Sequence, residues 1–452
     1  MSLPPAASDL PVPRPWHPST GLWRHADFLK LWAAQTISKL GSGITANALP
    51  LIAVLVLGAG AVEMGVLVAA SSAPVVVLGL IAGAWVDRLP RRPVLIWTDL
   101  ARAVLLASLP VAALIGQLRM EHLVLVAAAV GVLTVFFDVA YQSFVPDLVT
   151  REHVLDANSK LAGSDAVAEI TTPGLTGLLV AVISAPLVIL LDALSFVASA
   201  LAVGSIRAPE PARSGHPSDQ APAAPGRPGR LWQEIVLGLR TVAGSPLLRS
   251  LAGYAAARTF FGSFIGPLYA LYALRELALG PVLLGITIGI GGASNLLGTI
   301  LVQPVTRRFG AGPTMLGAAL LGALTVFLIP LAQGPVLLAF ALLAVGQAFD
   351  AVYPLYDVNA LSLRQSVTPR PLMGRVNASM QVLEGGLAPV GALVGGLLGQ
   401  YLGVRATLLA AAAGIMISTV WLCFSPLRRH GPPLAPHAAA GGSPAAGGGA
   451  TS

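Results

Sequence analysis

Twelve runs of mostly apolar residues, each long enough to cross a lipid bilayer, restrict this chain to an all-α membrane fold. A spanning helix needs about 20 apolar residues, with a range of about 17–25. Only 10% of the residues are charged, whereas a soluble domain has about 25%. The runs cover residues 28–57, 63–86, 93–115, 121–144, 160–184, 186–206, 247–274, 281–304, 312–331, 335–362, 374–402 and 404–425.

The distribution of Lys and Arg predicts how the spans are oriented, because cytoplasmic loops carry the excess of positive charge. Arg119, Arg275 and Arg405 are assigned to odd-numbered connections, and Lys39, Arg102 and Arg258 lie well inside spans. The remaining 21 of 27 lie in the termini, in the even-numbered connections or at the ends of spans next to them. We therefore expect a multi-pass plasma-membrane protein with both termini in the cytoplasm. The same asymmetry explains the net charge of +7 by contact with anionic lipid, without a nucleic-acid partner.

Composition divides the chain into two halves. Stretches rich in Pro, Gly, Ala and Ser cannot bury enough apolar surface to order, and they occur in both tails and after the sixth run. An amphipathic segment, 231–240, follows the central stretch and is expected at the cytoplasmic surface. The predicted parts are a six-helix bundle with its tail (1–208), a linker (209–230), the amphipathic helix with a second bundle (231–429), and a tail (430–452).

The side chains required by several other classes of protein are missing from the sequence. A single cysteine, Cys423, excludes an intrachain disulfide, and the seven histidines show no metal-ligand spacing. We find no phosphate-binding loop, no zinc-protease motif and no compact N-terminal signal peptide. We therefore expect neither an enzyme nor a metal or cofactor.

The two halves repeat with an offset of 219 residues, and the repeat preserves charges within the spans. Each half has one cation in its first span, one acid in its fourth and one acid in its fifth, which indicates an ancient duplication. Gly43 and Gly262, like Asn158 and Asn377, repeat with the same offset. The charged pairs are Lys39 with Arg258, Asp138 with Asp357, and Asp165 with Glu384.

A lone charge at the centre of a spanning helix costs about 2.5–3.5 kcal/mol, so these groups are expected to pair. Protonation of one acid would release its cation, which makes proton coupling a plausible role; packing of the helices is the alternative. Glu169 lies one helical turn after Asp165 and has no counterpart in the second half, so it is a candidate proton carrier. Asp192, and Asp99 with Arg102, are interpreted as structural, and Asp350 is a lesser candidate.

A charge-dense turn between the second and third runs carries the most specific motif. It reads Gly83-Ala84-Trp85-Val86-Asp87-Arg88-Leu89-Pro90-Arg91-Arg92, and a degenerate copy ends at Thr306-Arg307-Arg308. The turn resembles the loop 2–3 signature of the major facilitator superfamily, although Pro90 stands where that family often has Gly. Phrases such as Leu191-Asp192-Ala193-Leu194-Ser195-Phe196 and Gly374-Arg375-Val376-Asn377-Ala378 resemble its enterobactin-exporter and macrolide-efflux branch.

The resemblance implies two pseudo-symmetric six-helix bundles that rock around a central cavity lined by spans 1, 4, 7 and 10. It implies that Asp87 meets the N-terminus of span 11, which begins near Gly374 and Arg375, and that this latch stabilises the outward-facing state. Such a contact agrees with the partial positive charge of a helix N-terminus. In span 5, Thr172-Pro173-Gly174-Leu175-Thr176-Gly177 keeps the Pro and the last Gly of the antiporter motif but lacks two of its glycines.

We expect from these features a proton-coupled exporter of a small amphipathic molecule such as a drug, an antibiotic or a siderophore. Its partners would be that molecule, the proton and membrane lipid, and the chain would act as a monomer. The alternatives are an importer or uniporter of a small metabolite, and a non-transporting membrane sensor of the same fold. The expected cavity residues, besides the charges above, are Trp32, Gln35, Phe136, Phe137, Phe261, Asn295 and Tyr353.

Overall fold

The computed structural model describes residues 22, 25–86, 89–206, 228–369 and 372–429, and within these residues every regular element is a helix. In the first half these are α1 (Ala26–Leu51), η2 (Ile52–Val56), α2 (Ala61–Val86), α3 (Arg91–Leu114), α4 (Met120–Leu148), η3 (Arg151–His153), α5 (Val154–Ile183) and α6 (Ala185–Gly204). In the second half they are α7 (Pro228–Gly244), α8 (Pro246–Gly262), α9 (Ile265–Leu271), η4 (Tyr272–Glu276), α10 (Pro281–Phe309), α11 (Ala311–Val326), α12 (Leu328–Leu331), α13 (Val336–Ala348), η5 (Phe349–Ala351), α14 (Val352–Val367), α15 (Met373–Leu402), α16 (Val404–Cys423) and η7 (Pro426–Arg429).

Eleven helices in the described part of the chain are long and apolar enough to cross a membrane, which confirms the predicted all-α membrane fold. The seventh predicted run, 247–274, is divided between α8 and α9, so neither piece reaches spanning length alone. Pro267 lacks the N–H that would bond to the carbonyl of Ser263 four residues earlier, which favours a break in the helix there. The two helices together cover most of the seventh predicted run.

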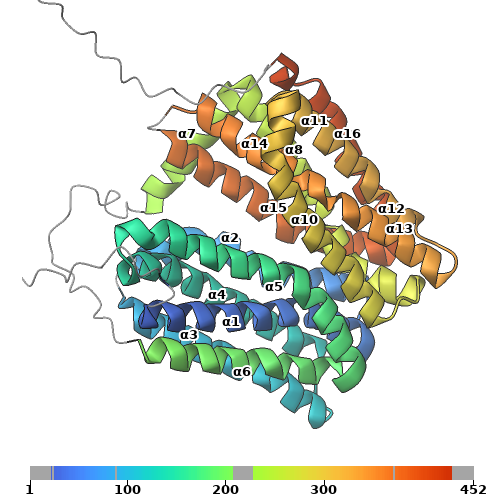
Figure 1. Ribbon diagram of the computed structural model, residues 1–452. Helices are drawn as coiled ribbons and strands as arrows, with labels where there is room; N and C mark the ends of the chain where they lie inside the picture. Colours follow the sequence, from blue (N-terminus) through green and yellow to red (C-terminus); the bar gives the residue numbers. More distant parts are fainter. Residues whose placement is uncertain (1–21, 23–24, 87–88, 207–227, 370–371, 430–452) are drawn as a thin grey trace, which may run out of the picture.

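The helices form two groups that lie side by side (Figure 1). Helices α1 to α6 make the first group, and α7 to α16 make the second. We call the side on which α1 begins and α6 and α16 end the terminal side. The two groups diverge toward the terminal side and meet near the opposite side.

The backbone repeats the duplication seen in the charges. Both first spans end in a π-helical turn, η2 in one half and η4 in the other, and the turn is closed by matching bonds from Leu57 to Ile52 and from Leu277 to Tyr272. Residues with positive φ also repeat, with offsets of 218 to 220 residues. They are Gly58 and Ala278, Gly116 and Gly334, and Ser184 and Gly403.

Glycines of α2 and α15 form one seam between the two groups. A Cβ on Gly396 would lie 2.8 Å from the Ala61 carbonyl oxygen and 3.0 Å from the Gly65 Cα. Gly391 and Gly395 of the same helix approach Phe260 and Phe264 as closely. Small residues spaced along one face of α15 thus let its backbone approach the neighbouring helices closely.

A second seam joins α5 to α10. A Cβ on Gly285 would lie 2.3 Å from the Pro173 carbonyl oxygen, and a Cβ on Gly177 would lie 2.3 Å from that of Pro281. These residues lie near the end of α5 and the start of α10, just as Ala61 and Gly396 lie near the start of α2 and the end of α15. Both seams thus close the molecule at the opposite side, where the two groups of helices meet.

The predicted amphipathic helix is the central part of α7 and packs on protein rather than only on a membrane surface. Gly238 lies against α15, because a Cβ there would come within 2.4 Å of the Arg375 carbonyl oxygen. Val242 is buried in a cluster with Leu248 and Val376. The segment therefore fastens the start of α8 to α15.

Ser184 is expected to strain the connection between α5 and α6. Its backbone has φ 84° and ψ 145°, nearly the same as Gly403 at φ 89° and ψ 152°, and its side chain makes no capping hydrogen bond. Side chains with a Cβ avoid this region, at a cost of about 1–3 kcal/mol. Ser184→Gly should therefore raise the apparent unfolding temperature of the purified protein, a gain reduced by the greater freedom of glycine in the unfolded chain.

The repeat supplies the matched control, Gly403→Ser, which should lower the unfolding temperature by creating the same strain. Equal melting of Ser184→Gly and wild type would contradict this account of the backbone.

The seam between α2 and α15 gives a second prediction. Gly396→Ala places a methyl group against the backbone of α2, so the two groups of helices should separate at the opposite side. Distances between spin labels at Gln117→Cys and Leu337→Cys, in a Cys423→Ser background, should lengthen in electron–electron resonance measurements.

Gly386→Ala is the matched control on the same helix, because a Cβ there would meet only the Val76 side chain, at an ordinary 3.8 Å. An identical distance distribution in Gly396→Ala and Gly386→Ala would show that this seam does not hold the opposite side closed.

Candidate functional site

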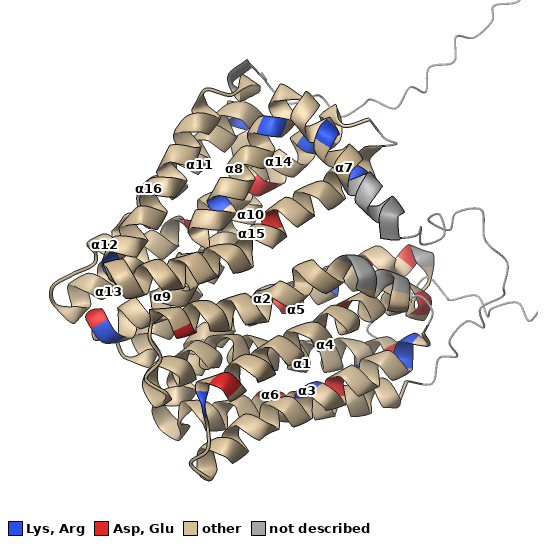
Figure 2. Ribbon diagram, turned by 180° about the vertical axis from the view of Figure 1, so that it is seen from behind, with Lys and Arg blue, Asp and Glu red and all other residues tan. Residues whose placement is uncertain are grey.

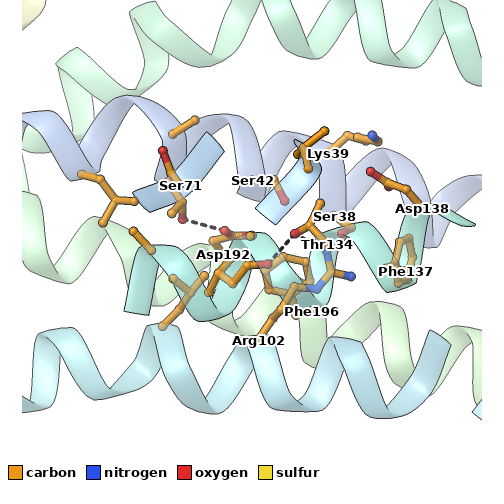
Figure 3. A pocket seen from close by; sticks show the side chains of 18 of the residues that line it. Ser38, Lys39, Ser42, Ser71, Arg102, Thr134, Phe137, Asp138, Asp192 and Phe196 are labelled. Carbon is orange, nitrogen blue, oxygen red and sulfur yellow. Dashed lines mark hydrogen bonds between the residues drawn. The ribbon is translucent and has the colours of Figure 1, made fainter. Parts of the chain in front are cut away.

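The first group of helices encloses a cavity of about 350 Å³ that we call the N-cavity (Figure 3). Its walls come from α1, α2, α3, α4 and α6. Along α1, polar side chains recur every three or four residues, so they share one face of the helix. The side chains of α1 that form this polar face are Gln35, Ser38, Ser42 and Thr45, and Lys39 lies beside them.

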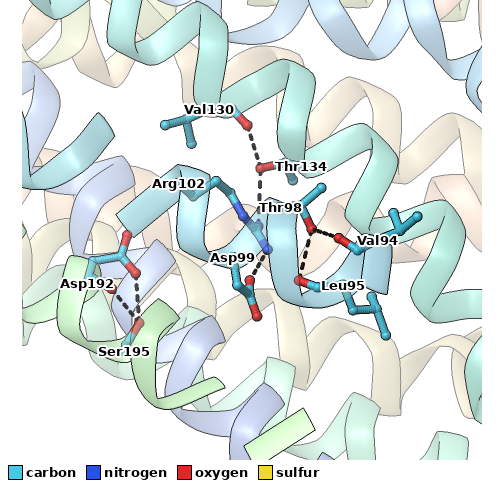
Figure 4. Close-up of polar contacts among 9 residues, drawn as sticks. All are labelled: Val94, Leu95, Thr98, Asp99, Arg102, Val130, Thr134, Asp192 and Ser195. Carbon is cyan, nitrogen blue, oxygen red and sulfur yellow. Dashed lines mark hydrogen bonds and ion pairs between the residues drawn. The ribbon is translucent and has the colours of Figure 1, made fainter. Parts of the chain in front are cut away.

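Asp192 of α6 is buried at the inner end of the N-cavity. The Thr45 hydroxyl donates to its carboxylate at 2.6 Å. The Ser195 hydroxyl donates to it at 3.0 Å (Figure 4). Gly41 makes room for this contact, because a Cβ there would lie 2.4 Å from the carboxylate. The carboxylate is held by neutral donors, so it joins α1 to α6 and also reaches the cavity wall.

Arg102 of α3 forms a buried ion pair with Asp99 one turn earlier, and both side chains are less than 5% exposed. Its guanidinium lies between the rings of Phe137 and Phe196, with centroid distances of 4.3 and 4.2 Å. Thr134 accepts a further bond at 3.4 Å (Figure 4). Aromatic faces and a carboxylate together replace the water that a buried guanidinium loses, which agrees with the predicted structural role.

Lys39 and Asp138 face the N-cavity from α1 and α4 (Figure 3). Asp138 lies in electrostatic range of Lys39, Arg102 and Asp165. The three charges that the sequence groups in the first half therefore lie near one another, with Asp165 outside the residues that line the cavity.

The second group of helices contains the corresponding cavity, the C-cavity, of about 550 Å³. Arg258 and Asp357 face it and form an ion pair of 2.7 Å, with the Asp357 side chain 51% exposed. The Arg258 guanidinium also approaches the rings of Tyr353 and Tyr356, at 5.8 and 5.5 Å. These two charged residues thus hold α8 to α14 at the cavity wall.

The two cavities meet at α2. Val68 lines both of them, Ser71 lines the N-cavity and Ser72 lines the C-cavity. The α2–α15 seam, made by Ala61, Gly65 and Gly396, lies closer to the opposite side. Val68 of α2 is therefore a wall shared by the N-cavity and the C-cavity.

Several predicted cavity residues lie outside these walls in this conformation. Phe261 packs so closely on α16 that a Cβ on Gly414 would overlap its ring. Phe136 lies 6.4 Å from the Trp85 ring, and Trp32 packs against a core cluster of the first group. Asn295 lies on α10 and its carbonyl accepts a bond from Thr299 at 3.1 Å. Gln35, Phe137 and Tyr353 do line the cavities.

The remaining predicted proton-coupling acids lie on the helices that join the groups. Glu384 of α15 lies in electrostatic range of Arg258, Arg364 and Asp357. Asp165 and Glu169 of α5 are exposed, and a Cβ on Gly292 of α10 would lie 3.2 Å from the Glu169 carbonyl oxygen. The N- and C-cavities have no wall residues from these three positions.

The motif between α2 and α3 is described only in part, because Asp87 and Arg88 lie outside the described residues. Arg91 donates to the Ser143 carbonyl at 2.9 Å and forms an ion pair with Asp147 of α4. Arg92 donates to the Gly204 carbonyl at the end of α6. Both arginines therefore fasten α3 to its neighbours on the terminal side.

Three further residues of the predicted gating motif belong to the helices themselves. Gly83 lies near the end of α2. Gly374 and Arg375 lie in the first turn of α15, and a Cβ on Gly374 would meet nothing within 4 Å. Among the described residues, the start of α15 therefore leaves space beside Gly374.

Sequence reasoning missed the polar face of α1, although its periodicity was visible. Ser38, Ser42 and Thr45 repeat with Gln35 at the spacing of one helical face within an apolar run. No pattern in the sequence indicated that Tyr254 and Tyr356 line the C-cavity. Which face of a helix turns inward is decided by its neighbours, so isolated aromatics cannot be assigned from the chain alone. Within the described residues, no group of three His, Cys, Asp or Glu side chains is arranged to hold a metal ion.

The sequence as a whole resembles known membrane transporters. A family model described as "Transmembrane secretion effector" matches residues 17–438. The chain is 32% identical over 418 residues to the multidrug efflux pump Tap of Mycolicibacterium fortuitum, which covers 89% of this chain and 96% of that protein. It is 27% identical over 402 residues to the uncharacterized MFS-type transporter YfiS of Bacillus subtilis, covering 87% of this chain and 92% of that one.

Solved structures show the same fold at low sequence identity. A bacterial homologue of the iron transporter ferroportin, in an inward-facing state, superposes with a TM-score of 0.69 at 18% identity, covering 89% of this chain and 99% of that one. The nucleoside transporter NupG gives a TM-score of 0.66 at 13% identity, covering 88% and 98%.

Proposed function

Because this chain belongs to the transmembrane secretion effector family of the major facilitator superfamily, we propose that it exports a small amphipathic molecule in exchange for protons. Its assignment as a transporter and not an enzyme follows from the family. We propose efflux because the similarity to a multidrug efflux pump extends over 96% of that protein. The family establishes neither the substrate nor the coupling ion, and we propose both.

The chemistry of the cavity supports a neutral or cationic substrate. In the C-cavity the charge of Arg258 is balanced by Asp357 at 2.7 Å. In the N-cavity Lys39 faces Asp138, and Asp165 lies near them. An anionic substrate would need an unbalanced cation, whereas these cations already have acidic neighbours. The remaining walls are largely apolar and aromatic, which suits a ring-bearing molecule.

The orientation proposed from Lys and Arg places the terminal side in the cytoplasm. The groups of helices diverge toward that side, so this conformation would receive a substrate from the cytoplasm (Figure 2). The seams formed by Gly285 with Pro173 and by Gly396 with Ala61 would separate when the cavity opens outward. In alternating access, the two groups of helices would lose their contact at the opposite side and form contact at the terminal side.

We assign proton coupling to carboxylates whose surroundings change when the two groups of helices move against each other. Asp138 neighbours Lys39 in the N-cavity, and Asp165 lies within electrostatic range of Asp138. Glu169 lies on α5 where that helix meets α10 of the other group. We propose that this set takes up a proton from outside in the outward-facing form, which weakens its hold on Lys39, and releases that proton to the cytoplasm in the inward-facing form.

Export can be tested in two steps. A panel of antibiotics and siderophores, applied to an expressing and a deleted strain, first identifies a transported compound. Inside-out vesicles with an acidic interior should then accumulate that compound after radiolabelling, and Asp165→Asn or Glu169→Gln should abolish the accumulation. A reduction of about tenfold or more is expected for loss of an essential proton carrier.

Asp156→Asn is the matched control, because Asp156 lies in the first turn of α5 and pairs with Lys160 outside the cavities. Its vesicles should accumulate the compound normally. Uptake that survives every carboxylate change would favour the uniporter, and failure of all compounds in wild type would favour a non-transporting sensor.

The latch between Asp87 and the start of α15 is proposed from the motif alone. In the outward-facing form its carboxylate would accept from the free N–H groups of α15. Asp87→Asn should therefore reduce the outward-facing population, measured with the spin labels at 117 and 337. This shift is opposite in sign to that expected for Gly396→Ala, and an unchanged distribution would remove the latch from the mechanism.

A further inference from the structure

A third cavity, which we call the Asp350 cavity, lies in the second group beside the C-cavity and encloses about 350 Å³. Tyr353 lines both cavities, so its ring stands between them. Its walls come from α9, α10, α11, α12, α13, η5 and α14. Tyr269 of α9, Gln347 of α13 and Asp350 of η5 are polar side chains that the C-cavity does not share. The proposed export mechanism makes no use of these side chains.

The Asp350 carboxylate has no counter-ion within the part of the chain that the structure describes. No Lys, Arg or His lies in its electrostatic range, and it forms no ion pair there. This differs from Asp138, Asp357 and Glu384, each of which has a cation nearby. An ionised carboxylate within a membrane span is costly when it lacks such a partner.

The regular α-helix is interrupted at Asp350. The span from 336 to 367 changes from α13 to the 3₁₀ turn η5 and back to α14, and Asp350 is the central residue of η5. The Ser294 hydroxyl of α10 donates to the Ala348 carbonyl at 2.9 Å, which satisfies one carbonyl at the break. Interrupted helices near the midplane commonly mark binding sites in transporters.

Glycines of α10 let that helix pack closely against the break. A Cβ on Gly291 would lie 2.9 Å from both the Asp350 carboxylate and the Gln347 amide oxygen. A Cβ on Gly298 would lie 2.1 Å from the Ala351 carbonyl oxygen. Side chains larger than glycine at 291 would therefore crowd the carboxylate.

The duplication shows that Asp350 is specific to the second half. The repeat offset of 219 residues relates it to Gly131, which has no ionisable side chain and lines the N-cavity. Asp99 and Asp192 are likewise confined to one half, but each is held by donors inside the protein, whereas Asp350 has no counter-ion among the described residues. Its presence in one half fits a role that the pseudo-symmetric scaffold does not need.

We propose that the Asp350 cavity binds the positively charged group of an organic cation, with Asp350 as counter-ion and Tyr269 and Tyr353 as aromatic walls. Tyrosine rings attract cations, and a carboxylate adds a charge-assisted contact. A divalent metal ion fits less well, since it prefers several carboxylate or carbonyl ligands and Asp350 is the sole carboxylate of this wall. The inference rests on the proposed export function and narrows its substrate class to amphipathic cations.

Binding of tetraphenylphosphonium to the purified full-length protein tests this assignment, because that cation is apolar and keeps its charge at every pH. Asp350→Asn should weaken its Kd by about tenfold or more, and Asp350→Glu should recover most of the affinity. Triphenylphosphine oxide, a neutral molecule with similar rings, should bind wild type and Asp350→Asn equally. Size-exclusion profiles and melting curves establish that both variants are folded.

Asp156→Asn removes the same charge outside the cavities and should leave the affinity for tetraphenylphosphonium unchanged. Equal affinity of wild type and Asp350→Asn overturns the assignment, as does the absence of tetraphenylphosphonium binding to wild type. A competing effect of Mg²⁺ or Mn²⁺ that depends on Asp350 would instead assign a metal site. These failures are separable from failure of export, because gradient-driven uptake of a neutral compound would still support the proposed function.

Discussion

Lipid cannot solvate an ionised side chain, and this constraint explains where charges lie inside the two groups of helices. Arg102 is neutralised by Asp99 and covered by two aromatic rings, and Arg258 pairs with Asp357. Lys39 has Asp138 opposite it across the N-cavity. Asp350 departs from this pattern, and a ligand that supplies the missing positive charge would complete it.

The second constraint is that the two groups must meet closely and yet separate. Contacts through glycine satisfy both needs, because backbone meets backbone without interlocked side chains. Gly396 on Ala61 and Gly285 on Pro173 close the same side of the molecule. Their position agrees with a chain whose halves rock against each other.

Duplication accounts for much of the architecture but not for its chemistry. The π-helical turns, the positive-φ positions and the first-span cations recur in both halves. The cavities differ: Asp192 and Arg102 are found in one half, and Asp350 and its broken helix are found in the other. We infer that the shared features preserve the scaffold and that Asp350, with the break beside it, bears on which molecules it moves.

The sequence by itself predicted the positions of the spans and the repeat, because a bilayer requires a similar length and apolarity of every spanning helix, although the helix ends differ by up to about six residues and the seventh run is divided. It also identified Lys39, Asp138, Arg258 and Asp357, since charges within apolar runs are conspicuous. Tertiary structure alone decided which side chains share a cavity. Phe261 packs against Gly414, whereas Tyr269 and Asp350 line the same cavity although they are far apart in the sequence. The rotation of each helix is set by packing against partners distant in the chain, and periodicity along one run carries no record of those partners.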